Sequence, residues 1–302
     1  MTRVTVLMGG WSSEREVSLS SGKAAVAALT EAGFEVSVVD ADRNVNRYAS
    51  AIIETRPDVV FNALHGRFGE DGRVQSLLDI MGIAYTHSGV LASALAMDKP
   101  QAKKVLKAVG MPVAEDVLAT RHQVLTNALM APPYVLKPAC EGSSVAIHLI
   151  LTLSDVEALK AEPWPYGGTV MMERFIPGRE LTVSVLGDQA LAVTEITTER
   201  TFYDYEAKYA AGGSRHVVNP TDLPAGVAEE AKRLAILAHK TLGCRGLTRT
   251  DFRLDGRDLC FLEVNTQPGL TPTSLAPEQA AAVGIGFPEL VTRMVEAAAC
   301  DA

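Results

Sequence analysis

The side chains best suited to chemistry lie in residues 246–269, where two runs of apolar and β-branched residues flank a predicted tight turn. Asp251 lies on the first of these predicted strands, and Glu263 and Asn265 lie on the second. Arg249 precedes Asp251 by two residues and could meet negative charge held by a metal ion. Mg²⁺ takes oxygen ligands, usually one or two carboxylates together with substrate phosphates. The pattern therefore predicts a hairpin for nucleotide phosphate chemistry.

The length of the turn decides whether the two carboxylates share one face of the hairpin. Side chains of a strand alternate between faces, so a two-residue turn at Asp255 and Gly256 would put Asp251 and Glu263 on opposite faces. An odd-length loop, or a bulge for which Gly256 suits a left-handed position, would bring them together. A five-residue loop over 255–259 would set them directly opposite each other. The alternative is that both acids are solvated ends of an edge hairpin.

Length, charge and cysteine content exclude several classes of protein. A chain of 302 residues exceeds one core of ordinary size, so two or three domains are expected. A net charge of −8 without a lysine or arginine run argues against nucleic acid and anionic membranes as partners. Four scattered cysteines without a C-x-x-C pair are typical of reduced thiols in the cytoplasm. No apolar run is long enough to predict a membrane span, and residues 4–8 are too short for a signal peptide.

Residues 1–95 alternate predicted strands with predicted helices. The strands are expected at residues 4–8, 34–39, 58–64 and 83–86, and the helices at residues 18–32 and 74–81. This alternation favours a doubly wound parallel sheet, whose ligands bind beyond the carboxyl ends of the strands. Two polar loops follow such ends, one with Glu16 and one with His65. The first lacks G-x-G-x-x-G spacing, which argues against an NAD site; both side chains could also be ordinary loop residues.

Lys137 ends a predicted strand and precedes a loop, residues 141–145, that reads Glu-Gly-Ser-Ser-Val. A lysine beside backbone N–H donors suits the binding of a polyphosphate. The spacing differs from that of a P-loop, so a different mode of phosphate binding is implied. A lone lysine at a strand end is usually a solvated cap, but the acidic hairpin downstream favours the phosphate interpretation.

Seven polar motifs follow one another in an order that resembles a known enzyme family. They are residues 9–18, 65–72, 97–99, 137–144, 203–209, 249–251 and 263–269. Together they closely resemble the D-alanine–D-alanine ligases, a family of ATP-grasp ligases, over essentially the whole chain. The resemblance implies an α/β protein in which a doubly wound parallel-sheet domain, residues 1–95, precedes a two-lobed ATP-grasp α+β unit. Residues 96–178 would form its small lobe, and residues 179–302 its C-terminal lobe with the metal hairpin and the substrate loop.

The resemblance also implies roles for individual residues. Lysines would bind the ATP phosphates, with Glu173 and the backbone that follows it at adenine and Glu180 at the ribose. The ATP-binding residues would be Lys99, Lys137, Ser144, Glu173, Arg174, Ile176, Glu180 and Lys208. Two Mg²⁺ ions, or Mn²⁺ in their place, would be held by Asp251, Glu263 and Asn265, with Glu263 bridging them.

The amino-acid substrates would lie on the other side of the metal ions. Glu16 would bind the ammonium of the first D-alanine and link to Ser143 and Tyr209, and His65 would be a further substrate-binding residue. Ser274 would bind the carboxylate of the second D-alanine. Arg249 and the amide of Gly269 would stabilise the tetrahedral intermediate, while the loops at Ser143 and at 203–209 would close over the site.

The implied activity is the ATP-dependent joining of two D-alanine molecules through an acyl phosphate, with release of ADP and phosphate, for peptidoglycan precursor synthesis. ATP and D-alanine would be the partners, a homodimer the assembly and the cytoplasm the location. The alternatives are a D-alanine–D-lactate ligase, another ATP-grasp enzyme of the carboxylase type, and a non-catalytic nucleotide-binding module. Two positions depart from the family pattern: Ala146 replaces a common glycine, and Thr273 stands where some members have histidine.

Overall fold

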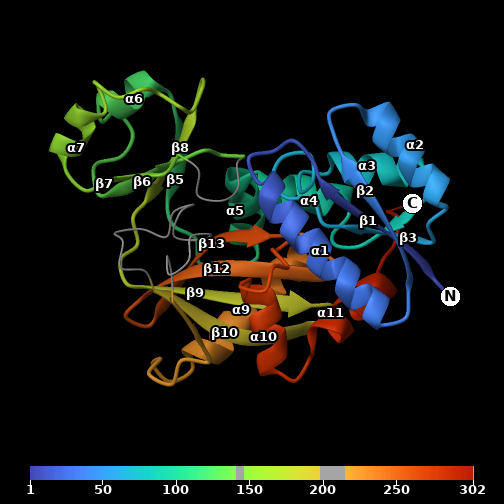
Figure 1. The fold of residues 1–302 in the computed structure, drawn as a ribbon. Coiled ribbons are helices and arrows are strands. Elements are labelled where there is room, and N and C mark those ends of the chain that lie inside the picture. The colour runs from blue at the N-terminus through green and yellow to red at the C-terminus, as the bar shows by residue number, and fades with distance from the viewer. Residues whose placement is uncertain (141–145, 198–214, 302) are drawn as a thin grey trace.

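The computed structural model describes residues 1–140, 146–197 and 215–301, which form three sheets joined by helices (Figure 1). A parallel sheet together with two antiparallel sheets confirms the predicted α/β class. Four predicted site residues lie outside the described ranges, namely Ser143, Ser144, Lys208 and Tyr209. None of the helices in the described ranges is long and apolar enough to cross a membrane.

The N-terminal sheet is parallel and has helices on both faces. Its order is β2-β1-β3-β4, with β1 at Arg3–Gly9, β2 at Glu35–Ala41, β3 at Val59–Asn62 and β4 at Ala84–Tyr85. Val6 of β1 packs with α1 (Arg15–Glu31), while its neighbour Leu7 packs with α2 (Val45–Thr55) and α3 (Arg73–Ile80). Because neighbouring strand residues face opposite ways, β1 is buried on both faces, as in a doubly wound sheet.

Helix α2 was absent from the predicted elements. Its first turn is capped by the side chain of Asn44, which accepts from the backbone N–H of Arg47 at 3.2 Å. Only Tyr48 and Ile52 of this helix are buried. Tyr48, Ala51 and Ile52 gather on one face of the helix, so the pattern of an amphipathic helix was present in the sequence and was missed.

The second sheet forms a small lobe that follows two helices. Helices α4 (Val90–Met97) and α5 (Lys99–Ala108) lead into it, and its order is β5-β8-β6-β7. The strands are β5 at Asp116–Ala119, β6 at Tyr134–Lys137, β7 at His148–Ile150 and β8 at Val170–Arg174. Tyr134 and Leu136 of β6 face the lobe's own core, together with α6 (Arg121–Leu125) and α7 (Leu153–Ala158). The alternate residue Lys137 therefore faces the rest of the molecule.

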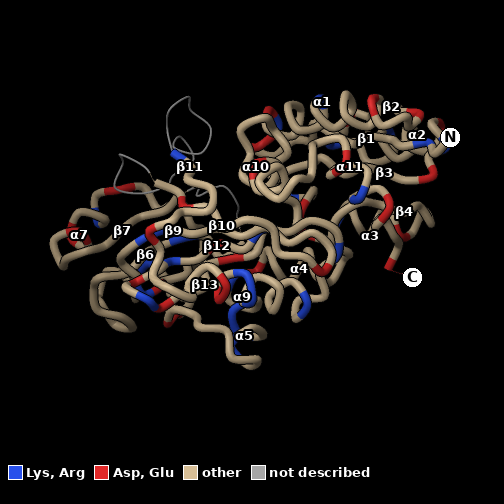
Figure 2. The backbone as a smooth tube through the Cα atoms, turned by 90° about the horizontal axis from the view of Figure 1, so that it is seen from below, with Lys and Arg blue, Asp and Glu red and all other residues tan. Residues whose placement is uncertain are grey.

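The third sheet is antiparallel, in the order β11-β10-β9-β12-β13. Its strands are β9 at Arg179–Leu186, β10 at Gln189–Thr197, β11 at Arg215–Val218, β12 at Leu247–Asp255 and β13 at Asp258–Asn265. One face is apolar, with Val183 and Phe252 packed in the core that α9 (Val227–Thr241) covers. The other face carries Thr182, Ser184 and Asp251. Figure 2 shows charged residues of both signs gathering where β6, β9, β12 and β13 come together.

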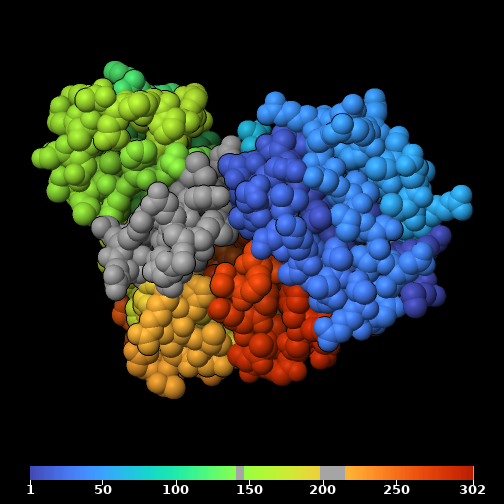
Figure 3. All heavy atoms as spheres, viewed as in Figure 1, coloured from blue at the N-terminus to red at the C-terminus, as the bar shows by residue number. Residues whose placement is uncertain are grey.

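The C-terminal helices return to the first sheet. Helix α10 (Leu275–Ala282) precedes α11 (Phe287–Glu296), whose Met294 belongs to the same core as Leu29 of α1. Ala299 then pairs with Tyr85 of β4. Figure 3 shows the C-terminal segment (red) against the N-terminal domain (blue), while the small lobe (green) stands to one side. The domain boundaries at residues 95 and 178 remain predictions.

Candidate active site

The metal hairpin brings its two carboxylates face to face through a bulge. Asp255 pairs with Asp258, so the turn has two residues, Gly256 and Arg257. The register then shifts: Phe252 pairs with Phe261, whereas Asp251 pairs with Glu263, and Leu262 is the extra residue. Of the two expected alternatives the structure has the bulge and not the odd-length loop, so the five-residue loop over 255–259 is wrong. The bulge lies beside the acids rather than at Gly256, which instead adopts a φ of 59° in the turn.

Each carboxylate of the hairpin is held by a cation of the chain. Arg249 donates through two nitrogens to the two oxygens of Asp251, at 2.8 Å each, and Thr182 donates to the same carboxylate at 2.6 Å. The ammonium of Lys99 lies 3.1 Å from Glu263. Asn265 pairs across the strands with Arg249, so its side chain belongs to the same face.

This donor set fits Mg²⁺ that shares its coordination with phosphates. Within the described ranges no three Asp, Glu, His or Cys side chains converge into a complete metal cage. Asp251, Glu263 and the amide oxygen of Asn265 nevertheless lie on one face, and two carboxylates are what Mg²⁺ commonly takes from a protein beside a nucleotide. The oxygen of Asn265 already accepts from the N–H of Gln267 at 2.8 Å, which fixes its direction.

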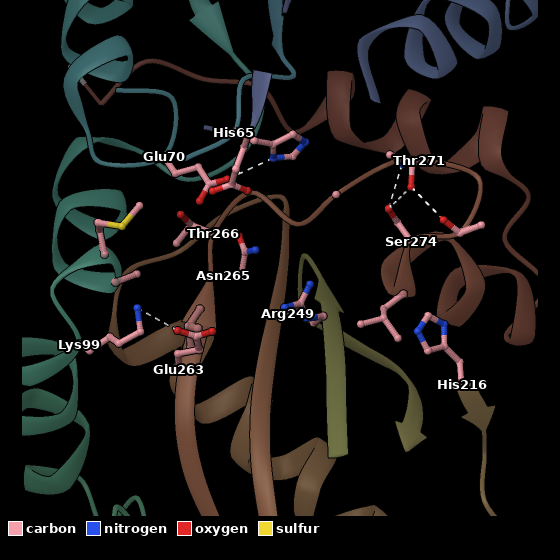
Figure 4. A pocket seen from close by; sticks show the side chains of 17 residues that line it. His65, Glu70, Lys99, His216, Arg249, Glu263, Asn265, Thr266, Thr271 and Ser274 are labelled. Atoms are coloured by element: carbon pink, nitrogen blue, oxygen red, sulfur yellow. Dashed lines mark hydrogen bonds and ion pairs between the residues drawn. The ribbon is translucent and has the colours of Figure 1, made fainter. Parts of the chain in front are cut away.

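A pocket in front of this hairpin joins the N-terminal domain to the C-terminal lobe (Figure 4). Loops from both parts of the chain supply its walls. Among the residues that line it are Glu14, His65, Glu70, Lys99, His216, Arg249, Glu263, Asn265, Gly269 and Ser274. Figure 4 shows Lys99 and Glu263 on one side of Arg249, and Ser274 and His216 on the other. Glu263 and Asn265 of the hairpin therefore face the same space as the predicted substrate residues His65 and Ser274.

The prediction for Glu16 is corrected by this geometry. Glu16 is exposed in the first turn of α1 and does not line the pocket, whereas Glu14 is buried and does. Residues two apart at a helix start point in very different directions, because one turn takes 3.6 residues. Ser12 fixes Glu14 by accepting from its backbone N–H at 3.1 Å and donating to the carbonyl of His65 at 2.7 Å. The sequence Ser-Glu-Arg-Glu contains two glutamates, and nothing in it shows which of them faces the pocket.

His65 is buried between two polar side chains. Its Nδ1 lies 3.1 Å from Glu70, and its Nε2 lies 3.0 Å from the hydroxyl of Ser21 on α1. These contacts lock the ring at the pocket wall. Glu70 was missed, although it lies in the same glycine-rich motif as His65.

The predicted nucleotide residues cluster at β6, β8 and β9. Glu173 is 3% exposed, and Lys137 donates to it at 2.6 Å. Burial opposes ionisation of Glu173, but Lys137 and Lys103 outweigh it and hold its pKa below the ordinary value. Glu180 lies 3.4 Å from Arg253, which also donates to the carbonyl of Ile176 at 3.1 Å.

Arg174 has fewer hydrogen-bonding groups available for a ligand than the prediction implied. Its backbone N–H already donates to the carbonyl of Glu115 at 2.8 Å, and its side chain donates to the carbonyl of Ala131. Both groups are therefore used within the chain. Ala146, where the family commonly has glycine, adopts a φ of 55°, a left-handed conformation that favours glycine.

Ser274 and Gly269 meet at the start of α10. Ser274 is the residue before the helix, and its hydroxyl accepts from the N–H of Thr271 at 3.0 Å. A Cβ on Gly269 would lie 2.9 Å from that hydroxyl, so glycine is needed for the close approach. His216, a lining residue that the sequence interpretation missed, lies 2.8 Å from Glu278 on the same helix. A lone histidine after an aromatic loop carries no distinctive signal.

Comparison with known proteins identifies the family. The family model for the D-ala D-ala ligase C-terminus matches residues 105–296, and that for the N-terminus matches residues 45–88. The D-alanine–D-alanine ligase of Rhodospirillum rubrum is 58% identical over 300 residues, covering 99% of each chain. The chain belongs to the D-alanine–D-alanine ligase family.

Other relatives of the D-alanine–D-alanine ligase family agree. The D-alanine–D-alanine ligase of Paramagnetospirillum magneticum is 56% identical over 306 residues, covering 99% of each chain. Among solved structures, the D-alanine–D-alanine ligase from Bacillus anthracis complexed with ATP matches with a TM-score of 0.81 at 27% identity. It covers 98% of this chain and 97% of that one. The predicted family and its ATP-grasp fold are therefore confirmed.

Proposed function

We propose that the chain joins two D-alanine molecules into D-alanyl-D-alanine, using ATP to form an acyl phosphate and releasing ADP and phosphate. One observation carries the proposal. Arg249, which holds Asp251, and the pair Lys99–Glu263 line the same pocket as Glu14 and Ser274. Groups suited to phosphoryl transfer and groups suited to amino-acid binding thus face one space, as a ligation through an acyl phosphate requires.

The phosphate half of the site works by positioning and charge neutralisation. Lys99 and Lys137 are both ion-paired to glutamates and can exchange these partners for phosphate oxygens. Asp251, Glu263 and Asn265 would hold Mg²⁺, which neutralises charge on the phosphates when bound. ATP is the co-substrate; the use of Mg²⁺, or of Mn²⁺ in its place, is part of the proposal.

The first D-alanine is held at the N-terminal end of α1. We assign its ammonium to Glu14, in place of Glu16, because Glu14 is buried and lines the pocket, where the other buried carboxylate, Glu70, is paired with His65. A buried carboxylate is a strong acceptor for an ammonium group. His65, locked by Glu70 and Ser21, shapes the same wall. The carboxylate of the first D-alanine then points toward the part of the site that binds the phosphates.

The second D-alanine is held at the N-terminal end of α10. Ser274 donates to its carboxylate, and the unpaired N–H groups of a first helical turn favour negative charge there. The amine then attacks the acyl carbon, and Arg249 with the amide of Gly269 meets the developing oxyanion. Ser143, Ser144, Lys208 and Tyr209 complete the site in this proposal. A homodimer and a cytoplasmic location belong to it as well.

Phosphate release separates this function from its alternatives. The purified chain, incubated with ATP and Mg²⁺, should release phosphate only when D-alanine is added. Release that requires D-lactate beside D-alanine would instead favour the depsipeptide-forming ligase. Absence of any D-alanine-dependent release would refute the proposal and leave a nucleotide-binding module.

A further inference from the structure

Lys103 on α5 is the most buried lysine in the described part of the chain, with 1% of its surface exposed. Its ammonium donates to the carbonyl of Ala114 at 2.8 Å and lies 2.7 Å from Glu173 and 2.9 Å from Asp116. An ammonium has three N–H donors, so these three acceptors use all of them. Lys103 is thus fixed within the chain and is not placed to reach a ligand.

Glu173 lies between Lys103 and a second lysine, Lys137, which is better placed to reach a ligand. One carboxylate oxygen faces Lys103, and the other accepts from Lys137 at 2.6 Å. Burial opposes the charge of Lys137, but Glu173 and Glu263 raise its pKa above the ordinary value. Lys137 therefore carries a positive charge between the small lobe and the metal hairpin, where phosphates are proposed to bind.

Binding of phosphates to Lys137 would take one partner from Glu173. A buried carboxylate that loses its only cation is strongly disfavoured. Here a second cation remains, because Lys103 is fixed beside Glu173 by its contacts within the chain. We propose that Lys103 is a positioning residue of the nucleotide site, which holds Glu173 in place so that Lys137 can exchange from Glu173 to the phosphates of ATP. This inference rests on the proposed function.

The substitution Lys103→Met tests the exchange, since methionine fills similar space without charge. Lys137 would then be the remaining lysine for Glu173, and phosphates would have to compete with that carboxylate. We expect the Kd for ADP in the presence of Mg²⁺, measured by calorimetry, to rise about tenfold or more. The KM for ATP should rise in parallel, while the KM for D-alanine should change less than about twofold.

Two further variants distinguish positioning from general damage. Lys104→Met makes the same change at the exposed neighbour on the same helix and should leave the Kd for ADP unchanged. In the double variant Lys103→Met with Glu173→Gln, the neutral amide no longer holds Lys137. The double variant should therefore bind ADP more tightly than Lys103→Met alone, a non-additivity that lost packing would not produce.

The inference fails if Lys103→Met binds ADP with wild-type affinity, or if its defect persists undiminished in the Glu173→Gln background. It also fails if the KM for D-alanine rises as much as that for ATP. Failure of the proposed function looks different, because the wild-type chain would then release no phosphate with D-alanine. Calorimetry with ADP needs no ligation and would still decide the role of Lys103.

Discussion

Two glutamates of this chain each bind a lysine, yet they differ in what surrounds them. Glu173 has a side chain that is 3% exposed and divides its oxygens between two lysines. Glu263 is 29% exposed and lies 3.1 Å from Lys99. The buried carboxylate has two lysine partners in the chain, of which Lys103 is the fixed one, whereas the open one faces the pocket.

The difference indicates which carboxylate serves structure and which serves chemistry. Removing one partner of a buried ion pair is strongly destabilising, because a charge is left in a poorly solvated place. An open pair contributes little to stability, about 1 kcal/mol or less, so its partners can be exchanged for a ligand. The comparison predicts opposite consequences for the same substitution at the two sites.

The largest expected effect is that of Glu263→Gln on turnover. Loss of a metal-binding carboxylate should reduce D-alanine-dependent phosphate release by about 100-fold or more. The fold should persist, since the pair with Lys99 is partly open. Phosphate assays at ordinary Mg²⁺, together with thermal unfolding, measure both quantities. Near-normal turnover would contradict the role of Glu263.

Glu173→Gln should show the reverse pattern in stability. Lys103 and Lys137 would lose their shared anion in a buried site, and the free energy of unfolding should fall by about 3 kcal/mol. Urea unfolding at neutral pH measures this change. The pKa of Glu173 lies below its ordinary value of 4.5, so its contribution is present above pH 4.5 and is lost as the pH falls further. A variant as stable as the wild type would remove the distinction between the two glutamates.

The comparison also bears on what the sequence could predict. The β-strand pattern and the family motifs predicted the α/β class, the hairpin and the need for either an odd-length loop or a bulge between the two carboxylates. The position of the bulge at Leu262 was not predictable, since any of several residues in residues 256–262 could have been the extra one. Strand pairing across the sheet decides this, and it is a long-range property.

Local ambiguity explains the remaining errors in the site. Glu14 and Glu16 lie two residues apart in a polar loop, and only the starting angle of α1 decides which one turns inward. His216 comes into the pocket because β11 pairs with β10, a contact between segments that share no motif. In the sequence, Lys103 is one of several lysines on a predicted helix. Its burial depends on how α5 packs against the small lobe, which the helical pattern does not show.

A pair of variants sharpens the assignment of the first substrate. Glu14→Gln removes a charged acceptor for the D-alanine ammonium and should raise the KM for D-alanine by about 10- to 100-fold. Glu16→Gln is the matched control, because this side chain is exposed, and it should change the same KM less than twofold. Initial rates at varied D-alanine concentration measure both. The reverse ranking would restore Glu16 and exclude Glu14.

His87 supplies a buried ionisable group without the partners that Glu173 has. It is 2% exposed, and neither ring nitrogen makes a hydrogen bond of normal geometry to another described residue. Burial lowers the pKa of His87 to about 3; the backbone of Leu247 offsets only part of this, and the charges of His65 and Arg245 add to it. The ring packs edge-on against Phe61, with centroids 6.2 Å apart.

The smallest predicted effect at neutral pH, and a clear one in acid, is that of His87→Gly. Because the folded-state pKa is depressed, the contribution of neutral His87 is present above pH 6.5 and is lost as the pH falls toward 3. The wild type should lose about 1.4 kcal/mol per pH unit through this group, and the variant should not. At pH 7.5 the two should differ by about 1 kcal/mol or less, since glycine also relieves the φ of 69° while losing the contact with Phe61. Urea unfolding at pH 7.5 and 5 measures the slope, and equal slopes in both proteins would show that His87 is already satisfied in the folded state.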